Sequence, residues 1–120
     1  MTRIYTLVNQ KGGVGKTTTA INLGAYLAKL DQRVLIVDID PQANATSSLG
    51  VEKNSVSTST YDALLSGDVP ASSILFNERL QLSLLPSSPA LAGAEVELVE
   101  EEGREFRLRD ALESFKGKYD

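Results

Sequence analysis

The sequence predicts an α/β fold in which a mostly parallel sheet is flanked by helices. Two observations carry this prediction. A β-rich segment at residues 3–9 breaks into glycines and then changes to helical spacing, and an apolar run at residues 34–37 ends in two aspartates and a proline. Because a strand, a helix and a parallel strand join as a right-handed unit, residues 3–37 are expected to begin such a sheet.

The elements of the first half follow from their apolar spacing. The helix is expected from Thr17 onward, and the run Val34–Val37 is typical of a central parallel strand covered on both faces. Residues 42–60 contain few large apolar side chains and predict a loop. One face of the helix is expected to carry Ala20, Leu23, Leu27 and Leu30.

The second half continues the alternation. Ser59 with Asp62 predicts a capping box on a short helix that runs through Leu65 and ends at Gly67. Leucines 80, 82 and 84 alternate with polar residues and predict a third strand nearer a sheet edge. After a cap at Ser88-Pro89 and a break at Gly103, two further helical faces are expected, with Leu91, Ala94 and Leu98 on the first and Leu108, Ala111, Leu112 and Phe115 on the second.

Composition removes several classes of chemistry. The 120 residues contain no cysteine and no histidine, which excludes disulfides, thiolate metal sites, cysteine nucleophiles and histidine bases. No apolar stretch approaches the roughly 20 residues of a membrane span, so we expect a cytoplasmic protein that does not use a membrane. A formal net charge of −4 argues against a chain-wide electrostatic grip on DNA, although a local basic patch stays open.

The segment QKGGVGKTTT at residues 10–19 predicts a phosphate site. Glycines 12, 13 and 15 permit a path in which backbone N–H groups, together with a helix N-terminus, surround phosphate oxygens. Lys16 is then placed to reach the β- and γ-phosphates and the Thr17 hydroxyl to ligate Mg²⁺, while Thr18 and Thr19 add donors for the α-phosphate. The loop differs from the usual G-x-x-x-x-G-K-[ST] pattern because Gln10 replaces the first glycine.

Three more charged residues stand around this loop. Lys11 lies at its rim, where its side chain can reach a partner's phosphate and stabilise the charge that develops during phosphoryl transfer. Asp38 and Asp40 follow a central strand and are expected to face the ligand crevice of an open α/β sheet. Asp38 would join the Mg²⁺ shell through water and Asp40 would orient the attacking water; taken alone, an Asp-x-Asp-Pro turn also terminates strands.

Residues Asn9 to Gly50 resemble the deviant Walker A ATPases, most closely the ParA/Soj branch that partitions plasmids and chromosomes. The motif K-G-G-x-G-K-[ST] and the segment DIDPQANAT carry this resemblance, and LLPSSPALAGAEVELV at residues 84–99 extends it. It implies a P-loop NTPase-like fold, Mg²⁺-dependent ATP hydrolysis and an ATP-dependent homodimer that faces its two nucleotides together.

The resemblance also implies a role for each matching residue. Lys11, Lys16 and Asp40 would be catalytic, as the lysine that reaches across the dimer, the phosphate-loop lysine and the residue that positions water. Thr17 and, less directly, Asp38 would serve the metal. The nucleotide would be held by Lys11, Gly12, Gly13, Val14, Gly15, Lys16, Thr17 and Thr18.

The chain stops near half the family's usual length, before the Walker B strand. Residues 1–120 would then be the N-terminal part of a single ATPase domain, and the adenine pocket and the basic residues for non-specific DNA binding would lie in the C-terminal half. A ParB-type centromere-binding protein would be the partner, in the bacterial cytoplasm at the nucleoid. The unfinished sheet exposes strand edges that favour aggregation or swapping, so ATP turnover is expected of the whole protein rather than of this piece.

Three other functions remain open at this point. A nucleotide-organised interaction module would dimerise on ATP with little hydrolysis. A MinD-like division-site ATPase would need a C-terminal amphipathic helix, and the Pro-Gln pair of DIDPQANAT is not expected there. Relatives of the nitrogenase iron protein need cysteines, which this chain lacks.

Overall fold

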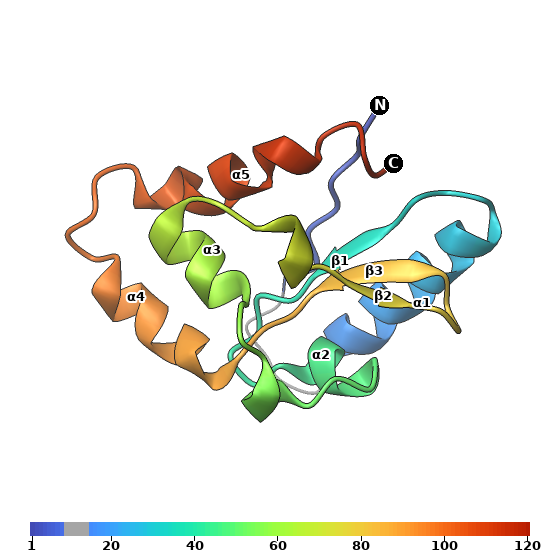
Figure 1. The fold of residues 1–120 in the computed structure, drawn as a ribbon, viewed down its shortest axis with the longest axis horizontal. Helices are drawn as coiled ribbons and strands as arrows, with labels where there is room; N and C mark the ends of the chain where they lie inside the picture. Colours follow the sequence, from blue (N-terminus) through green and yellow to red (C-terminus); the bar gives the residue numbers. More distant parts are fainter. Residues whose placement is uncertain (9–14) are drawn as a thin grey trace.

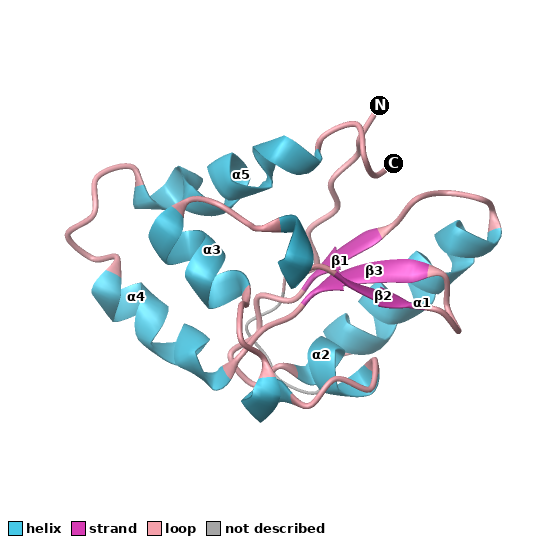
Figure 2. Ribbon diagram, in the orientation of Figure 1, coloured by secondary structure: helices cyan, strands magenta, loops and turns pink. Residues whose placement is uncertain are grey.

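The computed structural model describes residues 1–8 and 15–120 and confirms the α/β class. A three-stranded sheet runs in the order β1-β3-β2, formed by β1 (Leu35–Val37), β2 (Leu75–Asn77) and β3 (Leu82–Leu85). β1 and β3 are parallel, with Leu35 opposite Ser83, and β2 is antiparallel to β3. The described sheet is therefore small and mixed, with helices on both faces (Figures 1 and 2).

Helices supply the other layers. The α-helices are α1 (Lys16–Lys29), α2 (Asn44–Ser48), α3 (Thr60–Ser66), α4 (Ala94–Glu97) and α5 (Arg107–Leu112). Short 3-10 helices are η1 (Lys53–Ser55), η2 (Ala71–Ser73), η3 (Pro89–Gly93), η4 (Arg104–Phe106) and η5 (Glu113–Phe115). Within the described ranges, no helix is both long enough and apolar enough to cross a membrane.

The two faces of the sheet pack against different helices because side chains alternate along each strand. Ile36, Leu82 and Leu84 form a core with α1 on one face. On the other face Leu85 packs with Ala63 of α3, Val69, Ala111 of α5 and Phe115. The predicted strand at residues 34–37 is confirmed as the segment that joins both cores.

β3 is the central strand, and the expectation that it lies near an edge is wrong. All four of its residues are buried. The sequence analysis missed β2, which pairs with β3 through a turn in which Asn77 Oδ1 accepts the Leu80 N–H at 2.9 Å. Because β2 covers that side, the alternation of leucines 80, 82 and 84 did not indicate an exposed edge.

The buried face of α1 also differs from the predicted stripe. Its side toward the sheet carries Ile21, Gly24, Ala25 and Ala28, whereas Leu23 and Leu30 are exposed. A Cβ on Gly24 would lie 3.2 Å from Ile36 Cδ1, so the small residue lets the helix approach the strand closely. Close approach, rather than the largest apolar side chains, determines which face of this helix is buried.

The predicted helices of the second half are confirmed. Ser59 and Asp62 form the capping box of α3, and Gly67 ends the helix with φ 73°. Leu91, Ala94 and Leu98 are the buried residues of the η3–α4 segment and its C-cap. Ala111 of α5 and Phe115 of η5 are also buried. In the predicted loop at 42–60 the structure instead places α2, which begins at Asn44.

The strand expected at residues 3–9 is not formed by its described part, residues 3–8, and Asn9 lies outside the described residues. The Arg3 N–H donates to the Asp120 carbonyl at 2.6 Å, while the Asp120 N–H donates to the Arg33 carbonyl at 2.7 Å. Asp120 therefore lies between Arg33 and Arg3. Asp120 is a single residue and not a strand. Among the described residues, residues 4–8 therefore pair with no strand, and Ile4 and Val8 are exposed.

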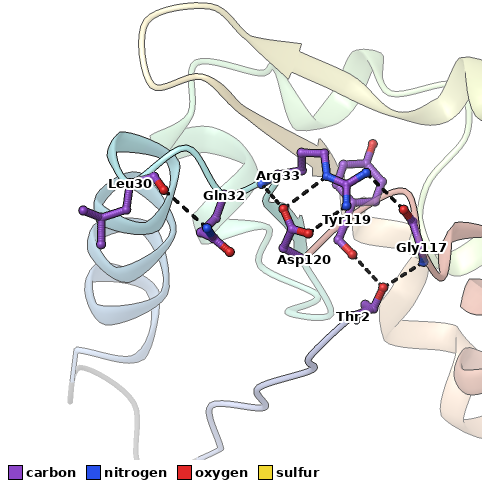
Figure 3. Close-up of polar contacts among 7 residues, drawn as sticks. All are labelled: Thr2, Leu30, Gln32, Arg33, Gly117, Tyr119 and Asp120. Atoms are coloured by element: carbon purple, nitrogen blue, oxygen red, sulfur yellow. Dashed lines mark hydrogen bonds and ion pairs between the residues drawn. The ribbon is translucent and has the colours of Figure 1, made fainter.

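Polar contacts join the two ends of the described chain (Figure 3). The Thr2 hydroxyl donates to the Tyr119 carbonyl at 2.6 Å and accepts the Gly117 N–H at 2.8 Å. The Arg33 guanidinium lies 2.7 Å from Asp120 Oδ1, and the Arg33 N–H donates to Oδ2 at 2.8 Å. These contacts hold residues 117–120 beside the start of β1.

The Arg33–Asp120 pair predicts a dependence of stability on pH. The guanidinium of Arg33 holds the pKa of Asp120 well below its ordinary value. A carboxylate whose pKa is lowered by folding stabilises the fold above its unfolded pKa, about 3.9, and loses that contribution as the pH falls toward the folded pKa. We expect the melting temperature of the 120-residue chain to fall below about pH 4, and less steeply in Asp120→Asn. Because the pair is exposed, added salt should weaken the difference; equal slopes in both proteins would contradict the prediction.

Candidate functional site

The predicted phosphate loop is described from Gly15 onward; Lys11, Gly12, Gly13 and Val14 lie outside the described residues. Gly15 has φ 87°, a left-handed conformation that favours glycine, and a Cβ there would meet no atom of the described residues within 4 Å. Its carbonyl accepts the Thr19 N–H at 2.8 Å, which is the first bond of α1. Gly15 thus leads the chain into the helix.

The N-terminus of α1 suits an anion. No side chain of the described residues caps it, and its first turn contains no acidic residue. The first N–H groups of a helix lack partners within the helix and carry partial positive charge, so phosphate oxygens satisfy them well. Lys16 and Thr17 are half-buried in this first turn and Thr18 is exposed. These residues fit a nucleotide phosphate chain, with the Thr17 hydroxyl as a donor oxygen for Mg²⁺.

The first turn of α1 lies at the same end of the sheet as the carboxyl ends of β1 and β3 (Figure 1). α1 also contacts α2, which follows the Asp38–Asp40 segment. The structure therefore brings the described half of the loop to the edge where the sequence analysis expected the two aspartates. Open α/β sheets bind ligands at this edge.

Asp38 is almost completely buried, with 4% of its surface exposed. Its Oδ2 accepts the Thr46 N–H at 2.8 Å and the Thr46 hydroxyl at 2.6 Å, and its Oδ1 accepts the Asp40 N–H at 3.1 Å. Charge-assisted bonds of this kind stabilise a buried carboxylate. Both oxygens are thus occupied by protein donors, and the role of Asp38 in the Mg²⁺ shell stays a prediction. Among the described residues, no three acidic side chains gather as a metal cluster.

Asp40 is half-buried, and its carboxylate is held by the loop that follows it. Oδ1 accepts the Gln42 N–H at 3.0 Å, and Oδ2 accepts the Asn44 side-chain amide at 2.7 Å. Its carbonyl accepts the Ala43 N–H at 2.8 Å and the Ser87 hydroxyl at 2.6 Å. A carboxylate offers about four acceptor positions, so these bonds orient it while leaving capacity for a water.

The loop around Asp40 contains a strained residue. Ala43 has φ 56° and is fully buried just before α2. A non-glycine residue in this conformation costs about 1–2 kcal/mol. The bonds that Asp40 makes with Gln42, Ala43 and Asn44 offset that cost, so the conformation of the loop and the orientation of the carboxylate are coupled.

The structure adds residues that the sequence analysis missed. Thr60 Oγ1 donates to the Asp38 carbonyl at 2.7 Å, and the Thr46 hydroxyl accepts the Ser87 N–H at 2.9 Å. Thr46 stands in a segment that was expected to be a loop, and Ser87 follows the third strand. The available signal was topological: the carboxyl ends of neighbouring parallel strands meet at one edge, so polar residues after β3 should contact those after β1.

Comparisons with known proteins show which family the chain resembles. A family described as an AAA domain matches residues 2–120. The chain is 52% identical over 119 residues to the chromosome partitioning protein ParA of Myxococcus xanthus, covering 98% of this chain and 42% of that protein. It is 51% identical over 120 residues to the sporulation initiation inhibitor protein Soj of Bacillus subtilis, covering 100% of this chain and 47% of that protein.

A solved structure extends the likeness to three dimensions. Cobyrinic acid a,c-diamide synthase from Mycobacterium smegmatis, with bound ATP analogue and magnesium, matches with a TM-score of 0.89 and 41% identity. The match covers 94% of this chain and 46% of that one. The chain thus spans less than half the length of these three proteins.

Proposed function

Because the chain belongs to the ParA/Soj family of AAA-domain partition ATPases, we propose that it is the phosphate-binding part of an ATPase that acts in chromosome or plasmid segregation. The observation that carries the proposal is the start of α1, where a left-handed Gly15 precedes Lys16 and Thr17. This start lies at the edge of the sheet where β1, which Asp40 follows, ends. The bound ATP analogue and magnesium of the similar M. smegmatis structure support it. The activity is proposed for the whole protein, because the relatives are more than twice as long as this chain.

In this proposal the described residues divide the work on the nucleotide. Gly15, Lys16 and the amides at Thr17 and Thr18 bind the phosphates, and the Thr17 hydroxyl ligates Mg²⁺. Lys16 neutralises charge that grows on the transferring phosphoryl group. Mg²⁺, held by the Thr17 hydroxyl, would supply further neutralisation of the phosphate charge. The loop residues Lys11, Gly12, Gly13 and Val14 would complete the site.

Asp40 is proposed to hold the attacking water. Its carboxylate is oriented by Gln42 and Asn44 and lies at the carboxyl edge of the sheet. Asp38 stabilises the same turn through the Asp40 N–H and would reach the metal only through water. The buried Asp38 would thus stabilise the turn, and the half-buried Asp40 would orient the water.

The partners follow from the proposed chemistry. Two copies would dimerise on ATP, each lending Lys11 to the nucleotide of the other. Non-specific DNA would bind through residues beyond this chain, and a ParB-type centromere-binding protein would stimulate hydrolysis at the nucleoid. The acidic balance of residues 1–120 supports placing the DNA contacts elsewhere in the protein.

Lys16→Ala in the full-length protein tests the phosphate site. Losing charge-assisted bonds to two phosphates should weaken Mg²⁺-ATP binding on the order of 100-fold, while the weak affinity for adenosine stays unchanged. Isothermal titration with both ligands measures the difference. Lys29→Ala is the matched control, because it removes an exposed lysine from the other end of the same helix.

Two results would contradict the proposal. Wild-type protein that binds adenosine as tightly as Mg²⁺-ATP has no phosphate site. A Lys16→Ala variant with the affinity of Lys29→Ala would remove Lys16 from it.

A further inference from the structure

We propose that Ser87 is a positioning residue for hydrolysis, which fixes Asp40 from the neighbouring strand. The inference rests on the proposed role of Asp40 in orienting water and adds to it a residue 47 positions away in sequence. Ser87 comes from the segment after β3, to which the phosphate chemistry assigns no role. Its hydroxyl donates to the Asp40 carbonyl at 2.6 Å.

Ser87 is fully buried, and both of its donors bond to the segment that runs from Asp40 into α2. The hydroxyl binds Asp40, and the backbone N–H binds the Thr46 hydroxyl at 2.9 Å. Pro86, which is also fully buried, precedes it at the end of β3. Ser87 is therefore held by the central strand, and it transmits that position to Asp40.

The main chain of Asp40 is consequently anchored on both sides. Its N–H donates to Asp38 Oδ1 at 3.1 Å, and its carbonyl accepts from Ser87. Its carboxylate is then oriented by Gln42 and Asn44, which belong to the same loop and would move with it. The bond from Ser87 is a contact to Asp40 from outside the loop, so it determines where the oriented carboxylate stands relative to the sheet.

Thr46 links the two anchors. Its hydroxyl donates to Asp38 Oδ2 at 2.6 Å and accepts the Ser87 N–H at 2.9 Å. One hydroxyl has one hydrogen to donate and lone pairs to accept, so Thr46 uses both capacities here. Serine can replace it in both bonds, and valine, of nearly the same shape, can replace it in neither.

The neighbouring serine offers a matched control. Ser88 is also buried, but its hydroxyl lies 3.2 Å from the Ser59 hydroxyl, at the start of α3. Replacing either serine by alanine removes the same atom from adjacent buried positions. Of these two serines, Ser87 is the one whose hydroxyl bonds to Asp40.

The test measures single-turnover hydrolysis and Mg²⁺-ATP affinity in the full-length protein. Misplacement of a reacting group by about 1 Å can cost about 10²-fold in rate, so Ser87→Ala should hydrolyse about 10- to 100-fold more slowly. Its affinity for Mg²⁺-ATP should stay within about twofold of wild type, because the bond acts on hydrolysis and not on binding. Ser88→Ala should hydrolyse at the wild-type rate, Thr46→Ser should retain activity and Thr46→Val should lose it like Ser87→Ala.

A double-mutant cycle separates positioning from general damage. If Ser87 acts through Asp40, adding Ser87→Ala to Asp40→Ala causes no further loss of rate. An additive loss, or a Ser87→Ala rate equal to that of Ser88→Ala, overturns the inference. Should Ser87→Ala not fold, Ser87→Cys, whose side chain is slightly larger and is a weaker donor, takes its place in the cycle. If Asp40→Ala itself hydrolyses normally, the proposed role of Asp40 fails, which is a different outcome from failure of Ser87 alone.

Discussion

Replacing Lys11 by alanine in the full-length protein is expected to lower ATP hydrolysis by about 10³- to 10⁵-fold. In the proposed dimer the second subunit would supply a cation that stabilises the charge developing on the γ-phosphoryl group, and alanine would remove it. Binding of ATP by each subunit should survive, because Lys16 and the N-terminus of α1 remain. The stable ATP-bound dimer should be lost.

Three measurements together test this role: ATP affinity, ATP-induced dimerisation by light scattering, and the single-turnover rate. Lys29→Ala, which removes an exposed charge from α1, should match wild type in all three. A Lys11→Ala protein that dimerises and hydrolyses normally would refute the role in the partner's site. Loss of ATP binding by the isolated subunit would instead place Lys11 on its own nucleotide.

Asp40→Ala should lower hydrolysis by about 10²- to 10⁴-fold, as expected when a residue that handles the attacking water is removed. ATP binding should persist, so the variant should accumulate as an ATP-bound dimer. Size-exclusion chromatography with ATP and a phosphate-release assay measure the two effects. Asp68→Ala, which removes an exposed carboxylate after α3, is the control.

The same assays separate partition ATPase from interaction module. An Asp40→Ala rate within about twofold of the control would remove Asp40 from the reaction. Wild-type protein that dimerises on ATP yet hydrolyses almost none would favour a module in which the nucleotide only organises a surface. In that case, a role of the protein in partition would not depend on ATP hydrolysis.

Local signals in the sequence were enough to predict several elements. The capping box of Ser59 and Asp62 and the stop at Gly67 are confirmed at α3, because capping chemistry depends on residues close in sequence. The apolar run at 34–37 is confirmed as β1 for a similar reason. The three-residue spacing of Leu91 and Ala94 likewise placed the buried side of the η3–α4 segment.

Elements that depend on distant partners were predicted less well. Residues 3–8 have strand-like composition, yet they form no strand. The neighbour that bonds to Arg3 is the single residue Asp120, and one residue does not make a ladder. β2 was missed because its three residues gain their structure from pairing with β3. The close approach at Gly24, which selects the buried face of α1, depends on Ile36 across the layer.

The candidate site divides in the same way. The spacing of the glycine motif predicted the special backbone conformation of Gly15 before α1. The end of the strand at β1 predicted the position of Asp38 and Asp40, which follow it. The sequence did not predict that the Thr46 hydroxyl would donate a hydrogen bond to the Asp38 carboxylate, or that the Ser87 hydroxyl would donate one to the Asp40 carbonyl. Those contacts join segments 8 and 47 residues apart, and only the folded sheet brings them together.

The contacts of Thr2 with Gly117 and Tyr119 have a practical consequence. Both ends of the described chain lie beside Arg33, at the amino end of β1, whereas Asp38 and Asp40 follow its carboxyl end. A tether for surface immobilisation attached at Met1 would therefore leave from the side of the sheet away from the aspartates. Such an attachment leaves the edge that carries the aspartates open to solution during binding measurements.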